Sequence, residues 1–179
     1  MGVNKTMNVQ DAINQRRSIR TYKNHPLPKG TVEALLEAAH LAPSAGNIQP
    51  WQFIIADKTE TKKALSHAAY EQKALVEAPL VIVVCANEDA AAERYGERGR
   101  SLYCIQDTAA AIQNILLTAC SLGLGTCWIG AFKEAEISRV INAPEGMRPV
   151  ALIPVGYPNE SPAARGRLPI SEIRHADSF

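Results

Sequence analysis

The feature that most constrains the fold is one uninterrupted apolar segment near the middle of the chain, Leu80–Ala86. It reads Leu-Val-Ile-Val-Val-Cys-Ala, and β-branched residues of this kind favour a β-strand. Successive side chains of a strand point to opposite faces, so an unbroken apolar run predicts a central strand that is buried on both sides. Such a strand needs other elements packed on both faces of its sheet.

Helical patterns on either side of this segment supply the covering layers. Apolar residues recur at helical spacing in residues 31–41, where Gly30 or Thr31 is expected to cap the helix. Residues 102–122 are apolar on nearly all sides, which predicts a long buried helix. Shorter helices are expected at residues 9–15, 59–70, 73–77 and 134–141, with Thr59 as a possible cap of the second. The polar residues 87–101 predict a solvated loop or a loose helix.

Three further strands are expected, at residues 53–56, 126–129 and 148–156. Pro149 and Pro154 lack the N–H that a central strand needs, so they favour an edge strand, or the ends of a strand, over the centre of a sheet. The elements show no regular β-α-β alternation and no G-x-G-x-x-G after the first strand, which argues against a dinucleotide-binding fold. We therefore predict one α+β domain over residues 1–179, a three-layer sandwich with a central mixed sheet flanked by helices.

Charge and cysteine content exclude several classes of protein. The net charge is +1, too small for a basic surface that binds nucleic acid. No apolar run reaches the roughly 18 residues of a membrane helix, and residues 1–7 read as a polar, flexible leader without a secretory core. The cysteines form no C-x-x-C pair and lie in apolar runs, which predicts buried free thiols and a cytoplasmic protein: Cys85, Cys104, Cys120 and Cys127.

The turn between the helix at 31–41 and the strand that follows is a candidate binding loop. Small residues at Ser44, Ala45 and Gly46 allow a ligand to approach the backbone closely, and glycine tolerates a positive φ. The side-chain amides of Asn47 and Gln49 offer donors and acceptors that suit the edge of a flat heterocycle. An ordinary connecting loop has a similar composition, so this pattern alone leaves both interpretations open.

Cationic residues gather in two other places. The first helix is followed by Arg16, Arg17, Ser18 and Arg20, and the C-terminal region contains Arg165 and Arg167 around Gly166. Arginine binds phosphate oxygens through paired N–H groups, and two arginines that flank one residue point to the same side of an extended chain. A solvated basic turn and a solvated tail are the alternatives that the residues themselves leave open.

The segments 16–20, 43–51 and 165–167 resemble, in their order and spacing, the motifs of the nitroreductase family of FMN enzymes. The resemblance extends from about Val9 to Arg167. It implies a three-layer α+β fold with a mainly antiparallel sheet. It also implies an intertwined homodimer with the flavin at the interface, in which the C-terminal extension, residues 158–179, reaches across to the partner subunit.

The resemblance also implies roles for individual residues. Arg16, Arg17 and Ser18 would lie near the phosphate and ribityl chain, and Arg20 near the pyrimidine edge of the ring. Arg165 and Arg167 would bind the phosphate, and backbone N–H groups around Ile129 and Gly130 would face the flavin N5 and O4. Gln106 would border the nicotinamide or substrate pocket. The loop residues that would contact a flavin held mainly by the other subunit are Pro43, Ser44, Ala45 and Asn47.

The sequence offers no catalytic side-chain set and no metal site. No His lies at a readable spacing from an acid and a nucleophile, and H-E-x-x-H, P-loop and G-x-S-x-G motifs are absent. This favours an enzyme whose cofactor carries the chemistry. The resemblance implies that NADH or NADPH reduces the flavin, which then reduces a nitroaromatic, a quinone or a related acceptor by a ping-pong mechanism. The alternatives are a flavin-binding carrier or sensor, or a specialised enzyme acting on flavin or on halogenated aromatics.

Overall fold

The computed structural model describes residues 7–179, and in this part of the chain four strands form one sheet with the order β1-β2-β4-β3. Their bounds are Trp51–Ala56 for β1, Leu80–Asn87 for β2, Gly125–Thr126 for β3 and Met147–Gly156 for β4. Neighbouring strands pair antiparallel, and one parallel bridge joins Ser18 to Thr126. Apart from Met7, the leader predicted at residues 1–7 lies outside the described residues.

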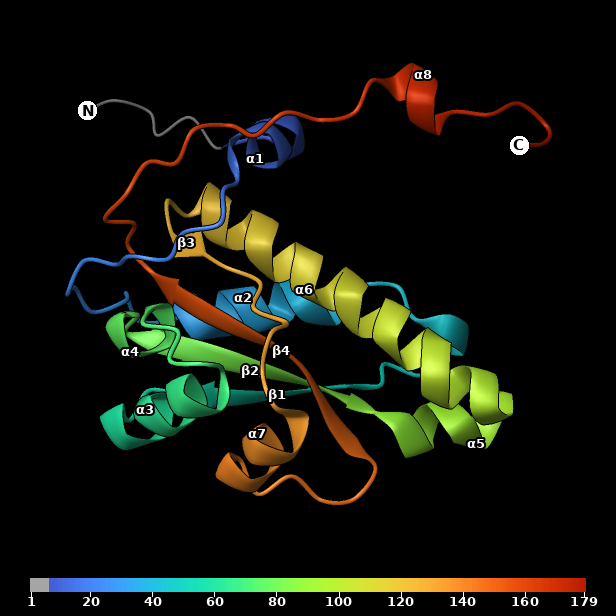
Figure 1. Cartoon of the computed structure of the whole chain (residues 1–179), viewed down its shortest axis with the longest axis horizontal. Helices are drawn as coiled ribbons and strands as arrows, with labels where there is room; N and C mark the ends of the chain where they lie inside the picture. Colours follow the sequence, from blue (N-terminus) through green and yellow to red (C-terminus); the bar gives the residue numbers. More distant parts are fainter. Residues whose placement is uncertain (1–6) are drawn as a thin grey trace.

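Helices cover both faces of this sheet, as Figure 1 shows. The larger helices are α2 (Thr31–His40), α3 (Thr59–Ala68), α5 (Glu88–Arg98), α6 (Cys104–Ser121) and α7 (Glu134–Val140). The short ones are α1 (Val9–Gln15), η1 (Ala45–Asn47), α4 (Ala74–Glu77) and α8 (Ile170–Ile173), and a π-helical turn, η2 (Gly99–Tyr103), joins α5 to α6. The three-layer α+β class predicted from the sequence is confirmed.

Strand β2 is the centre of the core, as its continuous apolar run predicts. Val81 and Val83 belong to the cluster that contains α3, α4 and α7, whereas Ile82 and Val84 pack with α2 and α6. All four side chains are fully buried. The alternation along one strand therefore joins the two helical layers, which is the physical reason for the sandwich.

Of the two alternatives for the prolines of the last strand, the edge of the sheet is wrong, and both prolines lie near the ends of the strand. Strand β4 lies inside the sheet, between β2 and β3. Its prolines are tolerated because β3 pairs only with Val155 and Gly156, which leaves most of that side of β4 without a strand. Pro149 in addition stands where the register with β2 shifts, next to Cys85. A missing N–H costs little at a bulge or beside an open edge.

Other boundaries differ by a few residues. Strand β1 already begins at Trp51, and the cap of α3 is Lys58, so Thr59 is the first helical residue. The predicted strand at 126–129 shrinks to the two residues of β3 and a separate bridge between Ile129 and Leu152. Of the two alternatives for residues 87–101, the helix is correct, and it is capped by the Asn87 side chain, which accepts a bond from the N–H of Ala90.

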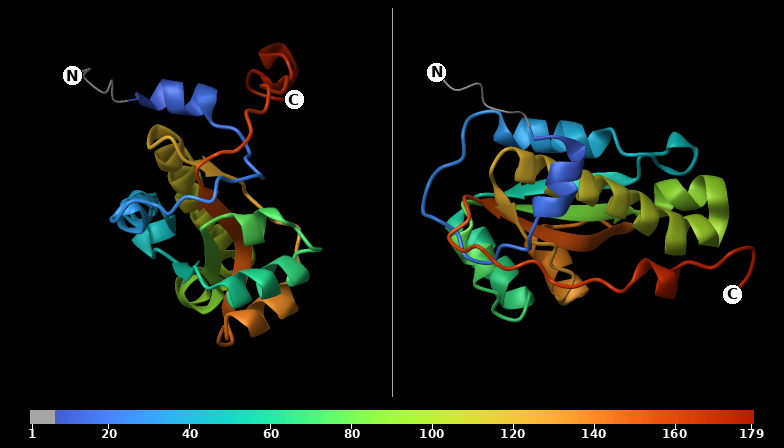
Figure 2. Two further views of the ribbon diagram at one scale, coloured as in Figure 1. Left: turned by 90° about the vertical axis from the view of Figure 1, so that its left-hand side faces the viewer. Right: turned by 90° about the horizontal axis from the view of Figure 1, so that it is seen from above.

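The C-terminal segment leaves the body of the molecule. After Pro158 it passes α1 and extends beyond it, with α8 standing apart from the sandwich (Figures 1 and 2). Four large apolar side chains on it are well exposed: Leu168, Ile170, Ile173 and Phe179. Cys85, Cys104 and Cys127 are buried free thiols, as predicted, whereas the free thiol of Cys120 is only half-buried. No helix within residues 7–179 is both long and apolar enough to cross a membrane.

Candidate functional site

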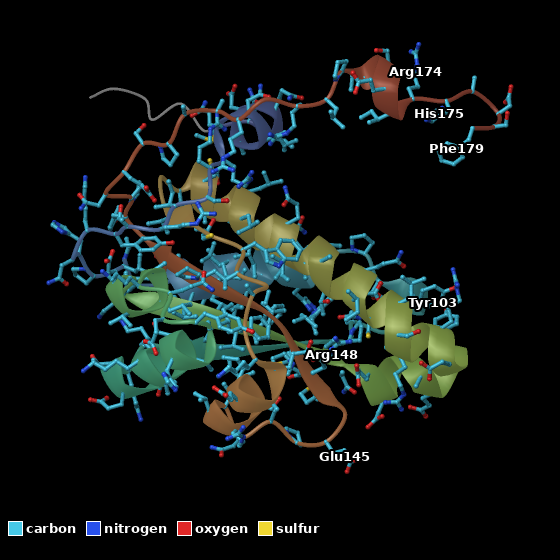
Figure 3. All side chains as sticks on the ribbon, in the orientation of Figure 1. Tyr103, Glu145, Arg148, Arg174, His175 and Phe179 are labelled. Carbon is cyan, nitrogen blue, oxygen red and sulfur yellow. The ribbon has the colours of Figure 1, made fainter. Side chains whose placement is uncertain are left out.

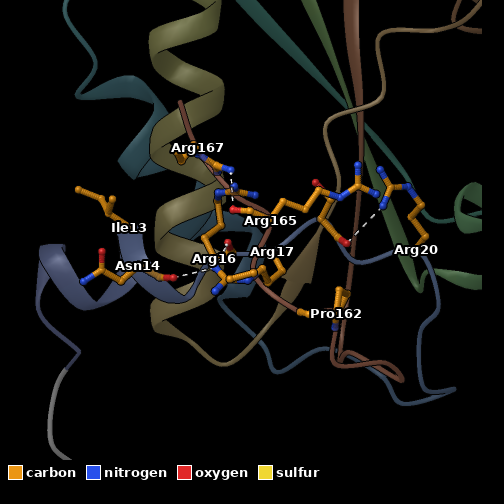
Figure 4. Close-up of a pocket in the computed structure, with 11 residues that line it drawn as sticks. Ile13, Asn14, Arg16, Arg17, Arg20, Pro162, Arg165 and Arg167 are labelled. Carbon is orange, nitrogen blue, oxygen red and sulfur yellow. Dashed lines mark hydrogen bonds between the residues drawn. The ribbon is translucent and has the colours of Figure 1, made fainter. Parts of the chain in front are cut away.

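Five arginines surround one cavity of about 530 Å³. Figure 4 shows these side chains around the end of α1 and the C-terminal segment: Arg16, Arg17, Arg20, Arg165 and Arg167. Ser18 also lines the cavity, and none of its described lining residues is acidic. Two clusters that are about 150 positions apart in the sequence thus meet, and together they form a strongly cationic pocket.

The first arginine cluster is positioned by the end of α1 and by the edge of the sheet. The helix ends because Arg16 adopts an extended conformation, with ψ at 128°. The next residues run beside β3, where the N–H of Ile19 donates to Thr126 at 2.9 Å. Ile19 is buried, so its neighbours Ser18 and Arg20 point to the other side, toward the cavity.

The second arginine cluster, Arg165 and Arg167, follows a segment whose backbone pairs with residues 21–23. The N–H of Lys23 donates to Tyr157, and the N–H of Asn159 donates to Thr21 at 3.0 Å. The Glu160 carboxylate accepts the N–H groups of Arg20 and Thr21. Sequence reasoning missed Glu160, and no local pattern could have found it because its partners lie about 140 positions away.

The loop that precedes β1 is held by the beginning of α6. The N–H of Ala45 donates to Asp107 Oδ1 at 3.0 Å, and the N–H of Gln49 donates to Ser44 Oγ at the same distance. Burial raises the pKa of Asp107, while the bond from Ala45 lowers it. Pro43 and Asn47 remain exposed in this loop, as does Gln106 at the start of α6. The predicted binding loop is therefore an ordered turn with free polar groups.

Gly46 has the predicted positive φ, at 55°. The reason that this position needs a small residue differs from the one expected from the sequence. A Cβ at this position would lie 2.6 Å from the Tyr95 hydroxyl and 2.8 Å from the Arg94 guanidinium. Arg94 Nη1 also donates to the Gly46 carbonyl at 3.0 Å. The close approach expected for a ligand is thus made by side chains of α5, which corrects the sequence interpretation of this glycine.

Of the two residues expected to present backbone N–H groups, only one is free to do so. The N–H of Ile129 donates to the carbonyl of Leu152 at 3.0 Å, and the return bond measures 2.9 Å. The Gly130 N–H has no acceptor within residues 7–179, and a Cβ there would meet nothing within 4 Å. The expectation for the Ile129 N–H is therefore wrong, because a backbone bridge to β4 uses it.

Apart from Ile129 and Gly130, which lie beside β4, the candidate residues fall into two groups at opposite ends of α6. Cys120, near its end, lines a small pocket together with Arg16 and Arg17, whereas Asp107, near its beginning, holds the loop. The distance between these two positions is roughly 20 Å along the axis, at 1.5 Å per residue. Within one chain, the structure does not bring the loop residues and Gln106 to the arginine cavity.

The thiol beside the cavity is not set up as a nucleophile. Cys127 is buried, and burial raises the pKa of its thiol more than Arg20 and a bond from Ser18 lower it. Burial likewise raises the pKa of Cys85 to about 12. A thiol reacts as its thiolate, so neither group supplies nucleophilic chemistry near neutral pH.

Comparisons with known proteins show which family the chain matches. The sequence model of the Nitroreductase family matches residues 13–75 and 59–157. A Methanothermobacter thermautotrophicus protein, named as a proposed NADH dehydrogenase or NAD(P)H nitroreductase, is 36% identical over 163 residues, which are 89% of this chain and 82% of that protein. An FMN reductase [NAD(P)H] of Bacillus subtilis is 27% identical over 94% of this chain and 73% of its own length.

A solved structure extends the comparison to the fold. The structure of B. megaterium NfrA2 superposes with a TM-score of 0.88 at 28% identity, and the match covers 96% of this chain and 74% of that one. Sequence model, relatives and fold thus agree over most of the chain. The protein is therefore an oxidoreductase of the nitroreductase family.

Proposed function

We propose that the protein is an FMN-dependent oxidoreductase that takes a hydride from NADH or NADPH. It then reduces a nitroaromatic, a quinone or a related aromatic acceptor in a ping-pong cycle. The observation that carries this proposal is the cavity with five arginines and no acidic lining residue. A phosphate monoester has roughly two negative charges at neutral pH, and such a cavity can neutralise them with paired N–H groups.

The residues of the cavity fit the parts of FMN. Arg16, Arg17 and Ser18 would hold the phosphate and the ribityl chain, together with Arg165 and Arg167, and Arg20 would lie at the pyrimidine edge. When bound, FMN would supply a ring that accepts a hydride from the nicotinamide and passes the electrons to the second substrate. The free N–H of Gly130 would orient that ring as a hydrogen-bond donor.

A second copy of the chain would complete the site. The loop residues Pro43, Ser44, Ala45 and Asn47 and the nearby Gln106 lie at the far end of α6 from the cavity. In a symmetric dimer they would reach the flavin of the partner subunit. Residues 158–179 would cross to the partner, and their four exposed apolar side chains support this because a stable interface would bury them.

Stopped-flow mixing of the yellow holoprotein with each pyridine nucleotide tests the proposal. We expect NADH or NADPH to bleach the flavin absorbance rapidly, and a nitroaromatic or quinone to restore it. A protein that binds FMN tightly but is not bleached by either nucleotide would instead be a carrier or a sensor. A protein reoxidised only by free flavin or by a halogenated aromatic would be a specialised enzyme.

Glu160 is expected to act on FMN only through the arginine segment that it holds. Glu160→Ala removes the acceptor for the N–H groups of Arg20 and Thr21, so FMN should bind about 1 kcal/mol more weakly. Glu160→Gln keeps an acceptor oxygen and should recover most of the affinity. Fluorescence titration of the apoprotein measures both variants. Equal losses in the two would show that the negative charge matters and the hydrogen bonds do not.

Arg20 and Cys127 are expected to differ in their effect on the flavin. Arg20→Ala removes a cation from the pyrimidine edge, so flavin reduction should slow and the reduction potential should become more negative. The shift should reach tens of millivolts, since about 30 mV corresponds to 1.4 kcal/mol for a two-electron couple. Cys127→Ala should leave turnover within a few-fold, because its thiol stays protonated. Redox titration and steady-state rates with excess FMN provide the measurement, and the opposite pattern would indicate thiol chemistry.

A further inference from the structure

A second group of arginines lies at the far end of α6, in α5 and the turn that follows it. We call Arg94, Tyr95, Arg98 and Tyr103 the arginine–tyrosine cluster. The two tyrosine rings meet edge to face, with centroids 5.2 Å apart. The Arg94 guanidinium lies 5.6 Å from the Tyr95 centroid, and that of Arg98 lies 5.3 Å from the Tyr103 centroid. Two cations thus flank one pair of rings, at the end of the molecule where Figure 3 labels Tyr103.

These two arginines have no carboxylate partner within residues 7–179. Two other arginines do: Arg100 pairs with Asp89 at 2.7 Å, and Arg148 pairs with Glu134 at 2.9 Å. Arg98 donates only its Nε to the Tyr103 hydroxyl, and Arg94 donates one Nη1 bond to Gly46. Each exposed guanidinium therefore has most of its N–H donors free to bind a ligand. The contact with a tyrosine ring limits the conformations of each arginine side chain before a ligand binds.

The cluster is fastened to the candidate loop. Arg94 and Tyr95 both pack on Gly46, in the middle of that loop. Tyr103 directly precedes α6, whose first turn carries Gln106. A π-helical turn between α5 and α6 produces this arrangement, and such turns often occur at functional sites. The two free cations thus lie next to the residues that would face the ring of the partner's flavin.

We propose that Arg94 and Arg98 bind phosphate groups of the nicotinamide dinucleotide. This inference rests on the proposed function. A hydride donor must place its nicotinamide over the flavin, so its pyrophosphate and adenosine extend over the adjoining surface. The arginine–tyrosine cluster places two arginine side chains on that surface, and arginine binds phosphate through paired hydrogen bonds. The cluster would determine affinity for the donor without contacting the reacting atoms.

The test compares hydride donors with and without phosphate. The double variant Arg94→Gln/Arg98→Gln is reduced in the stopped-flow instrument by NADPH, by NADH and by 1-benzyl-1,4-dihydronicotinamide, which carries no phosphate. We expect the Kd for both dinucleotides to rise about 10- to 100-fold, with unchanged limiting rates and an unchanged response to the benzyl compound. A loss restricted to NADPH would identify its 2′-phosphate as the ligand, and equal losses would identify the pyrophosphate.

Arg139→Gln is the matched control, because Arg139 is an exposed arginine on α7 that also forms no ion pair within the described chain. It should behave like wild type. The charge-retaining variant Arg94→Lys/Arg98→Lys should lie between wild type and the glutamine variant. An unchanged Kd for NADPH and NADH, or an equal loss with the benzyl donor, would overturn the inference. A wild-type protein that binds FMN but is reduced by no donor would instead refute the proposed function.

Discussion

Replacing Arg16 or Arg167 with alanine is expected to weaken FMN binding by about 1.5–3 kcal/mol, the contribution of a hydrogen bond to a charged group. Arg16 is half-buried and should lie near the upper end of this range, whereas the exposed Arg167 should lie near the lower end. Each 1.4 kcal/mol is about a tenfold change in Kd, so the loss is readily measured by fluorescence titration of the apoprotein. Arg139→Ala, on α7, serves as the control for loss of a surface cation.

Riboflavin gives an independent measurement of the same interaction. It has the ring and the ribityl chain of FMN but no phosphate, so wild-type protein should bind it much more weakly. The arginine variants should bind riboflavin nearly as well as wild type does, since the contact that they lose is to the phosphate. Equal affinity of the wild type for riboflavin and FMN would contradict the assignment of the cavity as a phosphate site.

Two inactive variants are expected to restore activity when they share one dimer. A cavity variant, Arg16→Ala/Arg167→Ala, and a loop variant, Ser44→Ala/Asn47→Ala, should each be strongly impaired as homodimers. In a mixed dimer, one site combines both defects and the other has an intact cavity and an intact loop. Co-expression in equal amounts should therefore recover about a quarter of the wild-type activity, because half of the dimers are mixed and half of their sites are intact.

The mixed dimer is isolated through two different affinity tags, and light scattering checks its mass. Dilution of the wild type to monomers should release flavin. Failure of the mixed dimer to exceed either parent would show that each chain builds its whole site alone. A monomer that keeps FMN tightly bound would lead to the same conclusion.

Local sequence patterns determined the layers of this protein. The apolar run of β2 requires burial on both faces, and the apolar circumference of α6 requires a buried helix, because burial follows directly from side-chain periodicity. The arginines at 16–20 and 165–167 left a solvated turn and a solvated tail open, and only the resemblance of their motifs implied a phosphate ligand. These inferences needed no knowledge of which segments are neighbours.

Tertiary structure alone decided which groups meet. Glu160 receives its N–H partners from a segment about 140 positions away, and the Ile129 N–H is used by Leu152 across the sheet. Gly46 is small because α5 packs on it, and β4 tolerates its prolines inside the sheet because β3 is short. Propensity and periodicity act over a few residues, whereas these contacts depend on strand order and on the direction of α6. That helix also separates the loop from the arginine cavity, and the proposal that a second subunit completes the site rests on this separation.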